Sequence, residues 1–467
     1  MLWLSIGGAS IADDSSTSED VSAKRPPPPY VFLRQNEDWS LLAEVARAEL
    51  TDPLDRIKYV PLSRDRPLCW VSFGGSARLR VETWSGFAFG TPAVDDDTFA
   101  LSRVLAHGDF HFGSRARLFV QGKSALATSR DLPGGTRTID VDSLDLQQGF
   151  VDVTASQGDG RGVVIRVGRQ GLQYGKQRLV SPLPWGNTLR AWDGASVLVK
   201  RKSWTIDAYW TRPVLVDKHD PNGADNGSEF FGTYAARSGR WSSDLYLLGL
   251  DRDQSSYNGT VGSEKRYTAG FRAETPTGVK GPRLEVEAAY QFGDVGSAQV
   301  SAWMLAVQGV WAMGAKSAAP SLTIALDLAS GDRSPGGDVE TFNQLFPLGH
   351  AYLGITDFVG RQNIAALKAG ITLRPRAKLS LVIASHVFRR YSTADALYHA
   401  GGQVLFPGDA GASRDVGVEL DAVVVYRLSR HLLADVGYAH FFAGEFVKQA
   451  GGNHDTDFGY VQGRFVF

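Results

Sequence analysis

The sequence has little of what most other architectures require. Only Cys69 is a cysteine among 467 residues, which excludes an internal disulfide framework and a zinc site built on thiolates. No stretch approaches the roughly 20 consecutive apolar residues of a membrane-spanning helix, which argues against a helical membrane protein. Charge of one sign is not in excess either, because 49 Lys and Arg stand against 50 Asp and Glu. We therefore expect no basic field that would attract nucleic acid.

Glycine, aromatic residues and arginine are plentiful instead. The chain has 52 glycines, 11% aromatic residues, and 36 arginines against 13 lysines. Guanidinium groups match planar carboxylates and phosphates better than ammonium groups do, so the arginine excess suggests an anionic ligand. A coding bias toward GC-rich codons is the alternative explanation.

The first 69 residues divide into three segments by composition. Residues 1–12 (MLWLSIGGASIA) end in a small-residue pattern and are interpreted as the remnant of a truncated signal peptide. Residues 13–29 are polar, end in four prolines and are expected to form a disordered leader. Residues 30–69 form an N-terminal segment, in which residues 39–47 could form a short helix.

From Trp70 onward, segments of about ten residues alternate in polarity with a period of two and are separated by turn residues, as in transmembrane β-barrels. Leu79 and Val81, for example, take one face of a segment whose other face carries Arg80. The last ten residues, FGYVQGRFVF, alternate in the same way and end in Phe467. This ending resembles the terminal strand of bacterial outer-membrane barrels, which the outer-membrane assembly machinery recognises.

A soluble β-sandwich would also alternate, but its strands are commonly five or six residues long. The longer segments here, with charges in the middle of the polar face, favour an all-β fold: a transmembrane antiparallel β-barrel over residues 70–467. At about 22 residues for each strand and its connections, this length predicts about 18 strands, and 16 is the alternative even number. Residues 30–69 would then lie on the periplasmic side.

The sequence contains no convincing catalytic or metal-binding motif. His107, Asp109 and His111 share one face of a predicted strand and could ligate a metal, but a polar stripe in the lumen explains them as well. The acidic segment 217–229 has oxygen ligands but lacks the spacing of an EF-hand. We expect no enzyme activity and no cofactor.

Three stretches carry a resemblance to a known family. They are residues 36–40 (NEDWS) with 52–62 (DPLDRIKYVPL), residues 166–194, which contain GRQGLQYGKQRLVSPLPWG, and residues 341–363 (TFNQLFPLGHAYLGITDFVGRQN). These stretches resemble the alginate export family of outer-membrane proteins. The resemblance implies an 18-stranded barrel that passes an anionic uronate polysaccharide out of the periplasm through an arginine-rich constriction closed by loops.

The candidate pore residues are arginines of two kinds. Some lie in the family-like stretches and the others have the parity of the polar strand face; they are Arg169, Arg178, Arg190 and Arg361, and Arg80, Arg117, Arg272 and Arg464. Asp193 is expected to hold one of these arginines in place. Each arginine could instead be a salt-bridge partner inside the lumen. An arginine without an acidic partner would indicate an anion site, and a paired arginine would indicate a structural role.

Two other functions fit the same sequence. The barrel could be a general or nutrient-uptake porin for small anionic or neutral solutes, and a soluble β-rich carbohydrate-binding protein is the alternative of another class. The expected partners are an anionic saccharide or small anionic solute, outer-membrane lipid, the assembly machinery acting on the strand that ends in Phe467, and periplasmic export proteins. The expected location is the bacterial outer membrane, without nucleic acid as a partner.

Overall fold

A computed structural model describes residues 28–46, 49–63, 69–158, 160–239, 241–276, 281–314 and 318–467. The predicted signal remnant at residues 1–12 lies outside the described residues, as does the leader except for residues 28 and 29.

The chain is built almost entirely from long strands. In chain order the strands of the wall are β2 (Cys69–Ser85), β3 (Asp97–Phe112), β4 (Ala116–Ala127), β5 (Asp142–Gly158), β6 (Arg161–Gln170), β7 (Trp192–Arg201), β8 (Trp204–Leu215), β10 (Ser228–Arg237), β11 (Ser242–Tyr257), β12 (Thr260–Glu274), β13 (Arg283–Val295), β14 (Ala298–Ala312), β15 (Ser321–Ala329), β16 (Ile364–Arg376), β17 (Leu379–Arg390), β20 (Asp415–Arg427), β21 (Leu432–Ala443) and β22 (Thr456–Val466).

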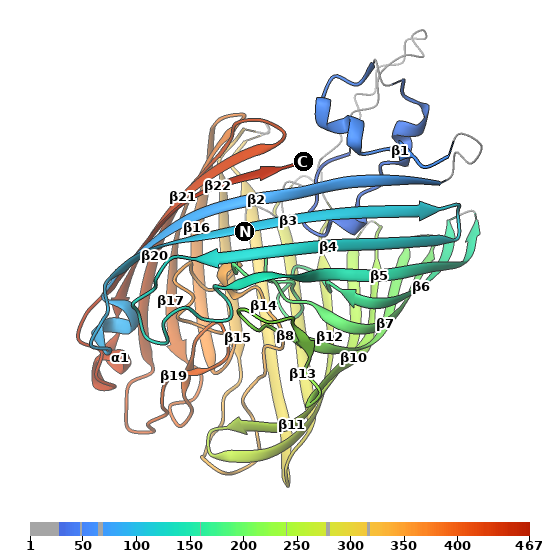
Figure 1. The fold of residues 1–467 in the computed structure, drawn as a ribbon. Coiled ribbons are helices and arrows are strands. Elements are labelled where there is room, and N and C mark those ends of the chain that lie inside the picture. The colour runs from blue at the N-terminus through green and yellow to red at the C-terminus, as the bar shows by residue number, and fades with distance from the viewer. Residues whose placement is uncertain are drawn as a thin grey trace.

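These strands close into one antiparallel barrel (Figure 1). Each strand pairs with the next along the chain, and β22 returns to pair with β2 from Ser76 opposite Val466 to Ser85 opposite Asp457. Within the described residues the wall therefore has 18 strands, and the predicted fold and strand number are confirmed. Closure is what the membrane demands, because an open sheet edge would leave backbone N–H and C=O groups unpaired in lipid.

The two ends of the barrel differ in their connections. Turns as short as residues 202–203 and 377–378 join strands at the end where β22 stops, whereas the other end carries long connections at residues 171–191, 330–363 and 391–414. Outer-membrane barrels have short periplasmic turns and long extracellular loops, so the long connections mark the extracellular end. The minor elements in the connections at this end are β9 (Gly223–Ala224), β18 (Leu397–Tyr398), β19 (Val404–Phe406), η5 (Phe87–Gly90), η6 (Gly349–Ala351) and α1 (Glu445–Gln449); β9, η5 and α1 lie in connections other than the three named.

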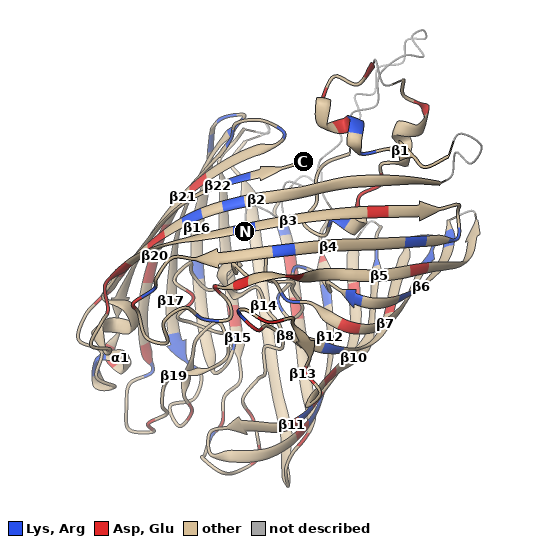
Figure 2. Ribbon diagram, in the orientation of Figure 1, with Lys and Arg blue, Asp and Glu red and all other residues tan. Residues whose placement is uncertain are grey.

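Side chains alternate across the wall as their sequence pattern predicts. Leu79 is 59% exposed on the outer face, whereas the next residue, Arg80, is 3% exposed toward the lumen. On β22, Val461 is 58% exposed and Gln462 is 6% exposed. Charged residues consequently occur along the middle of many strands rather than only at their ends (Figure 2). None of the described helices is long and apolar enough to cross a membrane.

The N-terminal segment packs beside the barrel near the start of β2 (Figure 1). Its described elements are η1 (Arg34–Asn36), η2 (Ser40–Glu44), η4 (Pro53–Ile57) and β1 (Val60–Pro61), and β1 pairs with β2. Where a helix was expected near residues 39–47, the described residues form the 3-10 element η2. Trp39, 2% exposed, anchors a small apolar cluster with Leu42 and Trp70.

Arg34 joins this segment to the seam where the barrel closes. Its Nη1 donates to the carbonyl oxygen of Gly75 on β2 at 3.0 Å, and its Nη2 donates to the terminal oxygen of Phe467 at 2.8 Å. Glu37 lies 2.7 Å from the Arg34 Nε and neutralises the buried charge. One guanidinium therefore bridges the first and last strands of the wall.

We expect Arg34→Gln to weaken closure at this seam. The change removes donors to two strands and leaves Glu37 buried without its cation, which should lower the free energy of unfolding by about 3 kcal/mol. Urea unfolding of the refolded protein, together with the temperature at which its compact band is lost on gels, measures the effect. Arg56→Gln, at an exposed arginine of η4, should leave both values unchanged. Equal stability of the two variants would contradict the assignment.

Candidate functional site

Two long loops from the extracellular end fold into the lumen. The 171–191 loop joins β6 to β7, and the 330–363 loop joins β15 to β16. Their apolar side chains are buried: Val180 is 1% exposed, and in the second loop Phe342 is 0% and Val359 1% exposed. Both loops contribute to the largest cluster of buried apolar residues in the described chain. The lumen is thus a packed interior at this level.

The two loops are joined by a short backbone ladder. Val180 and Phe346 form a parallel bridge, in which Ser181 N donates to Phe346 O at 2.9 Å and Phe346 N donates to Leu179 O at 2.8 Å. Arg361 Nη1 also donates to the carbonyl oxygen of Arg178 at 3.1 Å. A movement of one loop therefore requires a movement of the other or the loss of these bonds.

On one side of the lumen the loops are held by ion pairs. Arg178 Nη1 lies 2.5 Å from Glu285 and 3.1 Å from Glu287, both on β13. Arg361 Nε lies 2.8 Å from Asp327 on β15. All these side chains are at most 7% exposed. These two predicted arginines therefore meet carboxylates of the wall, and their charge is neutralised inside the lumen.

On the other side, wall arginines hold the turn at residues 184–187. Arg78 and Arg80 of β2 and Arg103 of β3 donate to backbone carbonyl oxygens of this turn. Arg80 also pairs with Glu82 at 2.7 Å. Sequence reasoning selected Arg80 but passed over Arg78 and Arg103, although the parity of their strands gave the signal.

Three further candidates have contacts of their own. Arg117 pairs with Asp109 at 2.6 Å and donates to Gln35 O at 2.7 Å, which brings η1 of the N-terminal segment against the inner wall. Arg190 donates to Pro347 O at 2.8 Å and so links the two loops again. Arg464 stands directly opposite Arg78 in the β2–β22 ladder.

Arg169 and Asp193 occupy outward-facing positions. They are cross-strand partners on β6 and β7, beside Val167, which is 56% exposed on the outer wall. Arg169 Nε and Nη2 donate to the two Asp193 oxygens at 2.8 and 3.0 Å. The pair lies next to the ends of β6 and β7 that carry the 171–191 loop, so it borders the outer surface and not the lumen.

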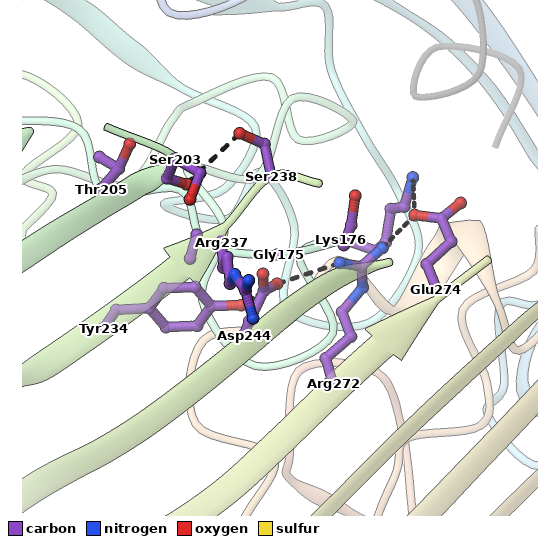
Figure 3. A pocket seen from close by; sticks show the side chains of 12 residues that line it. Gly175, Lys176, Ser203, Thr205, Tyr234, Arg237, Ser238, Asp244, Arg272 and Glu274 are labelled. Atoms are coloured by element: carbon purple, nitrogen blue, oxygen red, sulfur yellow. Dashed lines mark hydrogen bonds and ion pairs between the residues drawn. The ribbon is translucent and has the colours of Figure 1, made fainter. Parts of the chain in front are cut away.

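A pocket of about 360 Å³ lies beside Gly175 and Lys176 of the 171–191 loop (Figure 3). Its walls include Lys176 from the loop and Arg272 and Glu274 from β12. Arg272 Nη1 lies 3.0 Å from Asp244 of β11, and Lys176 Nζ lies 3.1 Å from Glu274, as the dashed lines in Figure 3 mark. Both signs of charge meet here, because three cations, Lys176, Arg237 and Arg272, line the pocket together with two carboxylates, Asp244 and Glu274.

The histidine and aspartate stripe on β3 forms ordinary polar contacts. Asp109 lies 3.2 Å from His111 and also pairs with Arg117, while the His111 ring stacks on Trp70 at 3.9 Å. Within the part of the chain that the structure describes, no group of three or more His, Cys, Asp or Glu side chains is placed to hold a metal ion.

The buried carboxyl of Asp395 fastens the 330–363 loop to the 391–414 connection, and the neighbouring carboxyl of Asp332 bonds within the 330–363 loop. Asp395 Oδ2 accepts from Asp332 N at 2.9 Å and from Thr341 Oγ1 at 2.6 Å. Asp332 Oδ1 accepts from Thr341 N at 2.6 Å. Burial, followed by the nearby negative charge of Asp395, raises the pKa of Asp332 from 3.8 to about 6.

This junction should tighten on acidification. Because the folded-state pKa of Asp332 is raised, the folded loop binds the proton more strongly than the unfolded loop does. Protonation of Asp332 therefore stabilises the folded loop, and this stabilisation is lost as pH rises through about 6. We expect fewer loop-driven gating transitions in planar bilayers at about pH 5 than at about pH 7.5.

Asp332→Asn should abolish this difference, whereas Asp338→Asn, at an exposed carboxyl of the same loop, should preserve it. More frequent gating at the lower pH in the unmodified protein would contradict the prediction.

Comparison with known proteins identifies a family and a fold. The model of the family described as "Alginate export" matches residues 69–461. A search of curated proteins finds no match.

Solved structures of several pseudomonad proteins share this fold. OpdO of Pseudomonas aeruginosa is 15% identical with a TM-score of 0.56, over 85% of this chain and 97% of that one. OprD of the same organism is 14% identical, with a TM-score of 0.55 and coverages of 85% and 93%. A BenF-like porin from Pseudomonas fluorescens Pf-5 is 12% identical, with a TM-score of 0.55 and coverages of 85% and 98%. At these identities the likeness concerns the fold alone.

Proposed function

This chain belongs to the alginate export family, and we propose that it passes an anionic polysaccharide or oligosaccharide with uronate-like carboxylates. The protein is a channel of the bacterial outer membrane. The arginine-lined path and the identity of the substrate are part of what we propose. No residue is assigned a catalytic role.

The observation that carries the proposal is a pair of buried lumen arginines, Arg78 and Arg103, without an acidic partner among the described residues. Arg78 and Arg103 are at most 5% exposed, yet neither lies within 4.0 Å of a carboxylate of any described residue. Their hydrogen bonds go to neutral oxygens of the 184–187 turn. Burying a charge without its counterion is costly, so such a pair is expected where an anion binds in part of the working cycle.

The ion-paired arginines have a different part in this proposal. Arg178 and Arg361 fix the loops against β13 and β15 through carboxylates of the wall. A polyanion that met only such neutralised sites would gain little electrostatic attraction. We therefore place the recognition of carboxylates on the β2 and β3 side and the anchoring of the loops on the opposite side.

Uptake of small solutes is the second candidate function. The pocket of about 360 Å³ beside Lys176 has the size of a small molecule, and its lining carries the carboxylates Asp244 and Glu274 as well as cations. A lining of mixed charge suits a small solute better than a polyanion, which the carboxylates would repel. Uptake assays in proteoliposomes with uronate oligomers and with small neutral or aromatic solutes separate the two functions.

The proposal predicts anion selectivity that depends on Arg78 and Arg103. In a salt gradient across a planar bilayer, the reversal potential of the wild-type channel should indicate preference for the anion. Arg78→Gln combined with Arg103→Gln should lower the anion-to-cation permeability ratio several-fold, because two uncompensated cations are removed. A wild-type channel that prefers cations would exclude the proposed role of these arginines.

The matched control removes the same number of charges elsewhere. Arg212→Gln combined with Arg333→Gln neutralises two arginines whose side chains are 43% and 86% exposed. Salt screens exposed charges, so this variant should keep nearly the wild-type ratio. A loss of selectivity equal to that of the Arg78 and Arg103 variant would show that the total charge matters and the lumen site does not.

A further inference from the structure

Three arginines face one another across neighbouring strands of the lumen wall. Arg78 of β2 stands directly opposite Arg464 of β22 on one side and Arg103 of β3 on the other. Like charges in directly opposed positions destabilise a sheet. A row of this kind therefore requires acceptors in front of it.

The acceptors in front of Arg78 come from the turn at residues 184–187. Arg78 Nη1 donates to Trp185 O at 3.0 Å and to Pro184 O at 3.2 Å. Its Nη2 donates to Gly186 O at 2.9 Å and to Asn187 Oδ1 at 3.0 Å.

Arg103 and Arg80 hold the same turn from either side. Arg103 Nη1 donates to Gly186 O at 2.7 Å, and Arg80 Nη1 donates to Trp185 O at 2.8 Å. The turn thus presents its carbonyl oxygens to three guanidiniums as a bound anion would.

These guanidiniums are only partly satisfied. The Nε atoms of Arg78 and Arg103 are buried and have no hydrogen-bond partner among the described residues. A carboxylate forms shorter and stronger bonds to guanidinium than a neutral carbonyl does, and it can accept two parallel bonds from one fork. A carboxylate that reaches this row therefore competes favourably with the turn.

We propose that the 184–187 turn is a latch that the substrate displaces. In the closed channel the carbonyl oxygens of the turn accept hydrogen bonds from Arg78 and Arg103. The carboxylates of an incoming acidic saccharide take the place of these oxygens and release the 171–191 loop. This inference rests on the proposed function, because it requires an anionic substrate. A neutral solute has no charge with which to displace the carbonyl oxygens, so the latch makes opening depend on the substrate's charge.

Release of the turn also loosens the second loop. The Trp185 ring lies between the Arg80 guanidinium, 3.9 Å from the ring centre, and the His350 ring, stacked at 3.6 Å. His350 belongs to the 330–363 loop, so the latch contacts both loops that fill the lumen. The ion pairs of Arg178 and Arg361 with the wall remain and keep the loops attached at the opposite side. Opening is then a swing of the turn away from β2 and β3.

Hydrogen exchange of residues 182–190 tests the displacement directly. The amides of Gly186, Thr188 and Arg190 are hydrogen-bonded in the closed state, to Leu183 O, Ile139 O and Pro182 O. A polyuronate hexamer should speed up exchange in this segment of the wild-type protein, and its fully methyl-esterified form should not.

Slower or unchanged exchange in a channel that is anion-selective overturns the latch and leaves the proposed function standing. A wild-type channel that prefers cations overturns the proposed function itself.

Asn187→Ala separates the latch from the anion site. Asn187 Nδ2 donates to Asp140 O at 2.7 Å, Leu126 O at 3.0 Å and Ser102 O at 3.1 Å, so the side chain fixes the turn without carrying charge. Its loss should raise ligand-free exchange of residues 182–190 about tenfold, since it removes several buried hydrogen bonds. The reversal potential of this variant should still indicate preference for the anion.

The matched control is Asn226→Ala, at an exposed asparagine that accepts from Arg212 at the extracellular rim. Amide hydrogen exchange of residues 182–190 in this variant should match that of the wild type. Both variants should retain the compact band on unheated gels. Wild-type exchange in a folded Asn187→Ala protein would overturn the latch.

Discussion

The structure depends on one constraint, that backbone polar groups in contact with lipid must find their partners within the wall. This constraint closes β2 against β22 and leaves no free sheet edge. Closure then fixes a side for every residue, since each strand alternates between lipid and lumen. Apolar residues such as Leu79 go outward and charged residues such as Arg80 go inward. The lumen of this barrel therefore collects charge that must be compensated where water is scarce.

The two loops in the lumen supply that compensation in two different ways. Arg178 and Arg361 reach from the loops to carboxylates on β13 and β15, and these buried pairs are costly to break because each partner would be left as an isolated charge. Arg78 and Arg103 reach from the wall to neutral carbonyl oxygens, which an anion can replace. The two loops are therefore held by ion pairs on one side of the lumen and by hydrogen bonds that an anion can replace on the other.

The sequence was sufficient for the fold because its signal is local. Alternation along each strand and the pattern that ends in Phe467 predicted the barrel, and the length of residues 70–467 predicted about 18 strands. The partners of each arginine were not predictable, because they depend on cross-strand register and on how the loops fold back. Parity assigned Arg80 and Arg78 to one face, but only the register places Arg78 opposite Arg464. The family-like stretch around Arg169 gave no sign that this side chain faces outward with Asp193.

The excess of arginine over lysine has a structural use whatever its origin. Arg78 bonds four oxygens of one turn, and Arg34 bonds two strands and Glu37 at once. A lysine at either position would offer three donors from a single nitrogen and could not span acceptors so far apart. The planar fork that suits these backbone carbonyls also suits a carboxylate, so residues that close the lumen are chemically equipped to recognise an acidic substrate. Structural and recognition roles therefore select the same side chain. The contacts of Arg78 and Arg34 require arginine at these two positions whether or not a coding bias contributes to the excess.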